Sequence, residues 1–294
     1  MGINQSKPQA NPLSSPNLKV TNGERLIWGR RTYVMGIINV SPDSFAGDGL
    51  ASDLPAVVEQ ALRFQAEGAD LLDIGAQSTR PGHTPISIEE ELARLLPALE
   101  AIVPEVALPI SVDAYRAPVA SPAVEAGASL INDIWGLKAD PKIAEVAAQH
   151  GVPLILMHNQ QGTDYQALLP DIFVSLRQSV LLATGAGVEP GNIILDPGIG
   201  FGKTPDHNLE VLRRLGEFRT LGHPLLLGTS RKSTIGRVLD LPVDQRVEGT
   251  AATVALSIAG GADIVRVHDV KEMVRVCRMT DAIVRNWRPA GWMP

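Results

Sequence analysis

The sequence predicts an α/β protein that folds as a single (β/α)8 TIM barrel, and three observations lead to this prediction. From Arg31 onward, short apolar runs alternate with amphipathic stretches, and the composition shows no break. Similar breaker segments, AEGAD, EAGAS and AGGAD, precede several of the apolar runs and indicate a repeated βα unit. Eight alternations favour one closed barrel over two sheets, and a length of 294 residues suits it, since α/β barrels typically hold about 250 residues.

Eight apolar runs are the expected strands. Near-continuous apolar runs of this length are typical of parallel strands that are buried on both faces. In chain order they are residues 33–38, 71–74, 110–112, 130–134, 153–157, 193–195, 225–228 and 264–267.

Two of the stretches between these runs show a helical pattern clearly, residues 88–103 and residues 140–151. The second is predicted to begin with Asp140 as a cap followed by Pro141, and to stop at Gly151.

The N-terminal segment differs from the rest of the chain. It is rich in Pro, Asn, Ser and Gln and lacks the apolar core of a secretory signal. We therefore expect a flexible tail over residues 1–24 and the barrel over residues 25–294. No stretch is long and apolar enough to span a bilayer. The single cysteine, Cys277, lies on an apolar helical stripe and fits a reducing compartment, so a cytoplasmic location is expected.

The overall charge limits the class of partner. A net charge of -6 and a pI near 5.5 argue against a nucleic-acid or membrane-surface binder, which normally presents a basic face. Small-molecule substrates are expected instead. An anionic substrate would need a local cluster of positive charge.

Polar residues follow nearly all of the predicted strands. A polar residue at one strand end is often only a helix cap. Residues at eight strand ends, however, meet if the strands close into a ring. TIM-barrel active sites lie at the carboxyl ends of the strands. Period-two spacing places Arg266 and His268 on one face, and likewise Ser111 and Asp113. The full set is Asn39, Asp73, Asp113, Asn132, His158, Asp196, Ser230, Arg231, Lys232, Arg266 and His268.

Eight segments, each at a strand end or in the loop after it, together resemble the dihydropteroate synthase family over about residues 31–286. The resemblance implies a transferase of folate synthesis that condenses 7,8-dihydropterin-6-ylmethyl diphosphate with 4-aminobenzoate. The products would be 7,8-dihydropteroate and diphosphate. The segments are MGIINVSPDSF, DIGAQSTRPG, ISVDAY, INDI, LMHNQQG, LDPGIGFGK, GTSRKS and VRVHD.

The resemblance also implies a role for each site residue. Asp113, Asn132 and Asp196 match the family's pterin-binding acceptors, and Lys232 matches its donor to the ring carbonyl or N5. For Asp196, the glycines of the following DPGIGFG also fit backbone that lies close to a ligand. Arg266, His268 and Lys232 are the expected catalytic residues.

The leaving group requires positive charge where negative charge develops as the C–O bond breaks. By resemblance, Asn39, Arg266 and His268 form the diphosphate site, and Asn39 is also a ligand of Mg2+, the implied cofactor. A hard cation held by few protein groups plus phosphate oxygens is ordinary behaviour for Mg2+.

Two loops, residues 41–50 and 77–85, are expected to complete the site as lids. The resemblance places 4-aminobenzoate among residues of the second loop and of two later segments. Ser233 opens a helix, and the exposed N–H groups at the start of that helix favour the carboxylate of 4-aminobenzoate. The residues implied are Thr79, Arg80, Pro81, Gly200, Phe201 and Ser233, together with Lys232.

The chain departs from the family pattern at Ala76, Gln77 and Ala114, beside ligand-contacting positions. Two alternatives remain open from sequence: a pterin-binding methyltransferase domain, and a paralogue that binds a pterin without turnover. The STRPG and SRKS segments favour the synthase over the methyltransferase. The family is usually dimeric through its outer helices, so a homodimer is expected.

Overall fold

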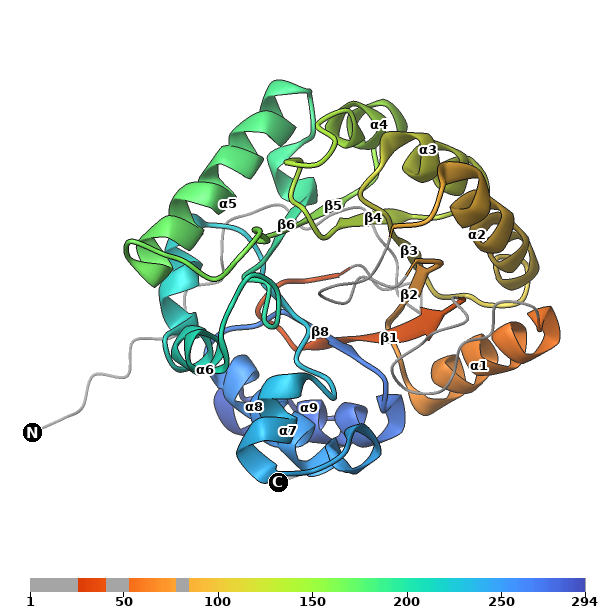
Figure 1. The fold of residues 1–294 in the computed structure, drawn as a ribbon. Coiled ribbons are helices and arrows are strands. Elements are labelled where there is room, and N and C mark those ends of the chain that lie inside the picture. Colours follow the sequence, from red (N-terminus) through yellow and green to blue (C-terminus); the bar gives the residue numbers. More distant parts are fainter. Residues whose placement is uncertain (1–25, 41–52, 78–84, 294) are drawn as a thin grey trace, which may run out of the picture.

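Eight parallel strands form a ring inside a layer of helices in the computed structural model, which describes residues 26–40, 53–77 and 85–293 (Figure 1). The strand order is β6-β5-β4-β3-β2-β1-β8-β7. A bridge between Leu195 and Leu225, with the Leu195 N–H donating to Pro224 O at 2.9 Å, joins β6 to β7 and completes the ring. The predicted single TIM barrel is confirmed. The strands are β1 (Tyr33–Asn39), β2 (Leu71–Gly75), β3 (Ile110–Asp113), β4 (Leu130–Asp133), β5 (Leu154–Met157), β6 (Ile193–Asp196), β7 (Leu226–Leu227) and β8 (Ile264–Val267).

Helices surround the ring of strands (Figure 1). In chain order, two helices, α7 and α8, lie between β7 and β8. In the described ranges, no helix combines the length and the apolar composition that a membrane span requires. The helices are α1 (Leu54–Glu67), α2 (Ile88–Ile102), α3 (Ala117–Glu125), α4 (Ile143–His150), α5 (Leu168–Gly185), α6 (Pro205–Arg213), α7 (Ser233–Leu239), α8 (Val247–Ala259) and α9 (Val270–Val284).

The predicted start of the helix at Asp140 is wrong, because α4 begins at Ile143. The Asp140 carboxylate accepts from the backbone N–H of Ala117 at 2.7 Å and from that of Lys142 at 3.1 Å. It therefore ties the start of α3 to the turn before α4. The predicted end is confirmed, since Gly151 caps α4 in the left-handed conformation with φ 66°.

An apolar cluster fills the amino-terminal end of the ring. Trp28 packs edge-on against Tyr33, with ring centroids 5.9 Å apart, so the segment before β1 covers this end. A second and larger apolar cluster lies between the strands and the helices. The carboxyl end of the ring is therefore the end that can admit a ligand. The first cluster comprises Leu26, Trp28, Tyr33, Met35, Leu71, Leu130, Ile155, Ile194, Leu226 and Ile264.

Candidate active site

The register of the strands brings the predicted polar residues together at the carboxyl end of the ring. Asp73 lies beside Ser111 across β2 and β3, and Asp113 lies beside Asn132 across β3 and β4. Each pair faces the interior, because these residues alternate with the apolar residues of the outer cluster. The prediction that distant strand ends converge on one opening is confirmed for the described residues.

Arg266 joins two of the acids. Its Nε donates to Asp73 Oδ2 at 2.5 Å and its Nη2 donates to Asp113 Oδ2 at 3.0 Å. The other oxygen of each carboxylate is buried and has no hydrogen-bond partner among the described residues. A buried acceptor without a partner is costly, so these two oxygens are suited to N–H donors of a ligand.

Burial changes the pKa of the acid and of the base in opposite ways. Desolvation raises the pKa of Asp113 to about 7, against the lowering effect of Arg266 and with a further rise from Asp73. For Arg266, the pKa is raised because Asp73 and Asp113 together outweigh the effect of its own burial. The guanidinium therefore stays charged, while Asp113 exchanges its proton near neutral pH.

The loop after β6 forms a second side of the opening. Asp196 Oδ1 accepts from the backbone N–H of Gly198 at 2.7 Å, and Gly198 has φ +74°. A Cβ at Gly198 would lie 1.9 Å from His158 O, so only glycine fits this turn. Burial raises the pKa of Asp196, and Lys232 opposes this rise.

Lys232 lies over the same loop. Its Nζ donates to Ile199 O and sits 4.7 Å from the centroid of the Phe201 ring. A Cβ at Gly200 would lie 3.1 Å from Lys232 Cδ, so glycine leaves room for the lysine stem. Burial lowers the pKa of Lys232 to about 8. The structure thus brings Asp196, Gly200, Phe201 and Lys232 together, as the sequence predicts.

Two residues that the sequence analysis left without a role also shape the site. Asp73 is fully buried and accepts from Asn132 Nδ2 at 3.2 Å as well as from Arg266. Lys203 is buried and donates to Gly198 O at 3.0 Å and to Phe201 O at 3.1 Å. The strand-end pattern included Asp73, but nothing in the sequence indicated that Lys203 turns inward.

His158 at the end of β5 is the third partner of Lys203, with Nζ and Nδ1 2.9 Å apart. Burial, reinforced by the nearby charge of Lys203, lowers the pKa of His158 to about 2. A neutral imidazole that accepts this hydrogen bond supports the loop. Burial also lowers the pKa of Lys203, to about 7.

His268 and Asn39 lie at the carboxyl ends of the neighbouring strands β8 and β1. His268 Nδ1 is 3.0 Å from Ser230 Oγ, and the His268 backbone N–H donates to the same hydroxyl at 3.2 Å. Arg231 pairs with Asp269 through Nη2 and Oδ1 at 2.5 Å. Ser233, the first residue of α7, is exposed.

Part of the predicted site lies outside the described residues. This applies to Thr79, Arg80 and Pro81, to the first predicted lid, 41–50, and to residues 78–84 of the second. The predicted tail, 1–24, also lies outside the described residues. Gln77, the last described residue before the gap, donates from Nε2 to the Tyr115 hydroxyl at 2.8 Å and accepts from Arg116 Nη2 at 3.1 Å. Arg116 also donates to Ile86 O at 2.9 Å, so it links the two sides of that gap.

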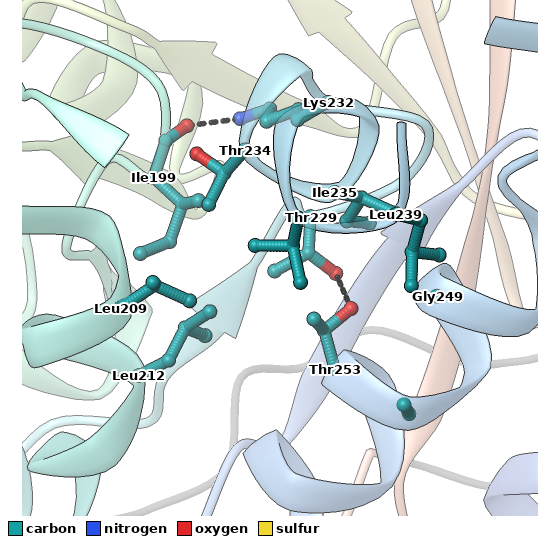
Figure 2. A pocket seen from close by; sticks show the side chains of 12 residues that line it. Ile199, Leu209, Leu212, Thr229, Lys232, Thr234, Ile235, Leu239, Gly249 and Thr253 are labelled. Atoms are coloured by element: carbon teal, nitrogen blue, oxygen red, sulfur yellow. Dashed lines mark hydrogen bonds between the residues drawn. The ribbon is translucent and has the colours of Figure 1, made fainter. Parts of the chain in front are cut away.

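A separate cavity of about 160 Å³ lies between α6, α7 and α8 (Figure 2). Leu209 and Leu212 line it from one side and Ile235 and Leu239 from another. Lys232 is the one charged residue of its lining, and its ammonium is directed to Ile199 O (Figure 2). This apolar space therefore lies behind the lysine and does not include the acids of the opening.

A barrel whose open end carries buried acids, an amide and two cations is the arrangement of an enzyme that binds a flat, polar heterocycle. In agreement, residues 35–268 match the family model described as pterin binding enzyme. The chain belongs to this family of pterin-binding enzymes.

Within that family its relatives are dihydropteroate synthases, and the chain is a transferase of folate synthesis of that kind. The dihydropteroate synthase of Bacillus subtilis is 53% identical over 266 residues, which cover 90% of this chain and 93% of the relative. That of Clostridium beijerinckii is 51% identical, with 88% and 96% covered.

Solved structures agree. The Xanthomonas albilineans dihydropteroate synthase with 4-aminobenzoic acid has a TM-score of 0.85 and 39% identity, and 94% of this chain and 100% of that chain are covered. The Coxiella burnetii dihydropteroate synthase with pteroic acid has a TM-score of 0.82 and 36% identity, with 90% and 98% covered.

Proposed function

We propose that the chain condenses 7,8-dihydropterin-6-ylmethyl diphosphate with 4-aminobenzoate to give 7,8-dihydropteroate and diphosphate. The observation that carries this proposal is the set of buried acceptors on Asp113, Asn132 and Asp196 beside the cations Lys232 and Arg266. The relatives that were solved with pteroic acid and with 4-aminobenzoic acid support the choice of substrates.

The pterin is assigned to the acids. A pterin presents N–H donors along its pyrimidinone edge and a ring carbonyl beside them. Carboxylate and amide oxygens of Asp113, Asn132 and Asp196 would accept from those donors. Lys232 would donate to the ring carbonyl or N5, which means exchanging its present acceptor, Ile199 O, for the ligand.

The diphosphate is assigned to Arg266, His268 and Asn39. Arg266 is a charged fork that matches phosphate oxygens, and His268 and Asn39 lie on the two strands that pair at this side of the ring. In this assignment, these groups would act as donors or hard oxygen ligands beside the C–O bond that breaks. Positive charge aimed at a leaving group is among the largest contributions to catalysis.

Asn39 would also hold Mg2+. Such an ion would take most of its other ligands from diphosphate oxygens and water. When bound, Mg2+ supplies further neutralisation of the diphosphate charge.

The reaction then balances without a protein base. The C–O bond of the methylene breaks and its electron pair leaves with the diphosphate, which Arg266 and His268 stabilise. The electron-rich dihydropterin supports the electron-deficient carbon, and the arylamine nitrogen donates its lone pair to form the C–N bond. The arylamine proton passes to solvent or to the released diphosphate.

4-Aminobenzoate is assigned to the space beside the β6 loop. Phe201 would provide an apolar wall for the benzene ring, and Lys232, Gly200 and Ser233 would complete this side. Ser233 opens α7 and is exposed, so the N–H groups there are accessible to a carboxylate. By resemblance, Thr79, Arg80 and Pro81 are also assigned to 4-aminobenzoate.

We also propose a cytoplasmic homodimer. Outer helices α7, α8 and α9, which lie together on one side of the barrel (Figure 1), expose several large apolar side chains. Exposed apolar residues that gather in one place mark interfaces. We call the exposed apolar residues of these three helices the apolar face: Val238, Leu239, Leu256, Met279, Ile283 and Val284. The free and buried Cys277 is consistent with a reducing compartment.

The decisive experiment mixes the two substrates with the purified chain and measures dihydropteroate and diphosphate together, with and without a Mg2+ chelator. We expect equimolar products that depend on Mg2+. A pterin-binding paralogue would bind both ligands and release no diphosphate, which would overturn the proposal. A methyltransferase would bind the pterin and leave 4-aminobenzoate unchanged.

A further inference from the structure

Asp73 is an acid in the centre of the site to which the reaction above gives no role. It is fully buried on the inward side of β2, with Ile37 of β1 and Ser111 of β3 as its register neighbours. One oxygen, Oδ2, accepts from both Asn132 and Arg266. A buried carboxylate is expensive unless it is paired, and here the pairing partners are two groups that face the substrate.

The first bond determines how Asn132 presents its amide. A side-chain amide has a donating nitrogen and an accepting oxygen, which occupy nearly the same space when the group is rotated. Because Asn132 Nδ2 donates to Asp73 Oδ2 at 3.2 Å, the nitrogen is committed to the protein. Asn132 Oδ1 makes no hydrogen bond with the described residues, so the amide has an acceptor left for a ligand N–H.

The second bond determines how Arg266 is held. Asp73 takes Nε at 2.5 Å, while Asp113 takes Nη2 at 3.0 Å. The Nε end is the one close to the backbone of β8, so this bond anchors the stem of the guanidinium. The terminal nitrogens keep their direction toward Asp113 and the diphosphate side.

We propose that Asp73 is a positioning and specificity-determining residue, which turns the Asn132 oxygen toward the pterin and anchors Arg266 through Nε. The inference rests on the proposed function, since it concerns the same pterin. It adds that the pocket recognises donors because a buried acid, to which the proposed reaction gives no role, holds an amide so that it acts only as an acceptor.

An exchange of the two side chains tests this. In Asp73→Ala, the Asn132 amide loses the acceptor that commits its nitrogen, so Asn132 can rotate and offer that nitrogen to the pterin. A buried mismatch of this kind costs on the order of a tenfold loss of affinity or more. In the double variant Asp73→Asn/Asn132→Asp, the amide donates to a carboxylate, which again offers an oxygen to the ligand. We expect the Kd of the double variant for the pterin to return to within about threefold of the wild-type value, by the same hydrogen-bond energetics.

The probe is 6-hydroxymethyl-7,8-dihydropterin, which lacks the diphosphate, and the measurement is calorimetric titration of folded variants. Ser111→Ala, at the register neighbour of Asp73, is the matched control and should bind within about twofold of wild type. The double variant should regain pterin affinity but not turnover. In wild type a single oxygen, Asp73 Oδ2, accepts from both Asn132 and Arg266 Nε. In the double variant the amide nitrogen at this place donates to residue 132 and cannot accept from Arg266.

Three outcomes are separable. If Asp73→Ala binds the pterin as wild type does, or if the folded double variant fails to recover affinity, the role of Asp73 toward Asn132 is wrong. Recovery of full turnover in the double variant would overturn its role toward Arg266. If wild type does not bind the pterin at all, the proposed function fails instead. If Asp73→Ala does not fold, Asn132→Asp serves instead: it sets two carboxylates against each other and should bind the pterin more weakly than the double variant, and equal affinity of the two would contradict the role of Asp73.

Discussion

Arg266 Nη2 and Asp113 Oδ2 lie 3.0 Å apart, although the two residues are separated by 153 positions in the chain. This ion pair joins β8 to β3 at the open end of the barrel and links the proposed diphosphate group to the proposed pterin group. A change in either residue is therefore expected to alter both the pterin contact and the diphosphate contact.

Removing the guanidinium should affect the chemical step. Arg266→Ala is expected to reduce kcat about 100-fold to 1,000-fold, the usual effect of losing one donor aimed at developing charge. Arg266→Lys keeps the charge but loses the fork, so it should recover only part of this loss. Diphosphate release under saturating substrates is the measurement, and wild-type turnover in Arg266→Ala would contradict the assigned leaving-group site.

Pterin affinity should depend on pH through Asp113. With a pKa raised to about 7 in the ligand-free site, the carboxyl becomes protonated as the pH falls, and one acceptor oxygen becomes a donor. We expect the Kd for 6-hydroxymethyl-7,8-dihydropterin to rise up to about tenfold per pH unit below that value. Titration between pH 5 and 8 measures it, and a constant Kd over this range would refute the prediction.

The same group makes fold stability depend on pH. Between the ordinary pKa of 3.8 and the folded value of about 7, the folded chain binds more protons than the unfolded chain. The contribution of Asp113 is therefore fully present below the ordinary pKa and is lost as the pH rises through the folded one. Asp113→Asn should lack this decline, which urea unfolding from pH 5 to 7 can follow. The pKa of Lys203 is lowered to about 7. Its contribution to stability therefore changes above pH 7 and grows as the pH rises.

Loss of the Lys203 ammonium should loosen the loop that carries Phe201. Lys203→Met leaves Gly198 O and Phe201 O without their donor, and each buried acceptor left unpaired costs about 1–3 kcal/mol. We expect a lower Tm and a raised KM for 4-aminobenzoate, with pterin affinity less affected. Tyr165→Phe removes one hydrogen bond, to Gly202 O at 2.7 Å, and should have the smaller effect. Equal losses for both substrates in Lys203→Met would argue against a local role.

The turn at Gly198 should tolerate no side chain. Gly198→Ala places a methyl group 1.9 Å from His158 O at φ +74°, so the free energy of unfolding should fall by more than about 4 kcal/mol. Gly185→Ala, where the added Cβ meets nothing within 4 Å, should leave stability unchanged or raise it by up to about 1 kcal/mol. Thermal unfolding compares the two, and a stable Gly198→Ala would show that the loop can adopt another conformation.

Charge on the apolar face of α7, α8 and α9 should disrupt the proposed dimer. Leu256 is 67% exposed and Ile283 is 70% exposed, and Glu at either position would be desolvated in an interface. We expect Leu256→Glu and Ile283→Glu to be monomeric by light scattering after size exclusion. Leu181→Glu, at a 71% exposed position on α5, is the control that should remain dimeric.

Much of this architecture follows from the sequence alone. Parallel strands buried on both faces require apolar runs, so all eight strands could be located, and the polar residue that ends each run indicated the open end of the ring. The same pattern identified Asp113, Asn132, Asp196, Lys232 and Arg266, because strand ends of a closed barrel must meet.

Other features were decided only by the tertiary structure. Asp140 resembled a helix cap in sequence, yet it bonds to the backbone of α3, since a carboxylate joins whichever N–H groups the packing brings near. Asp73 is a predicted strand-end residue without a predicted role, and Lys203 looks like an ordinary charged residue along the chain. Their roles arise because ring closure places Asp73 beside an arginine 193 positions away, and because a glycine-rich turn directs its carbonyls at Lys203. Period and composition determine where a side chain starts, whereas burial and three-dimensional neighbours determine which atom it bonds.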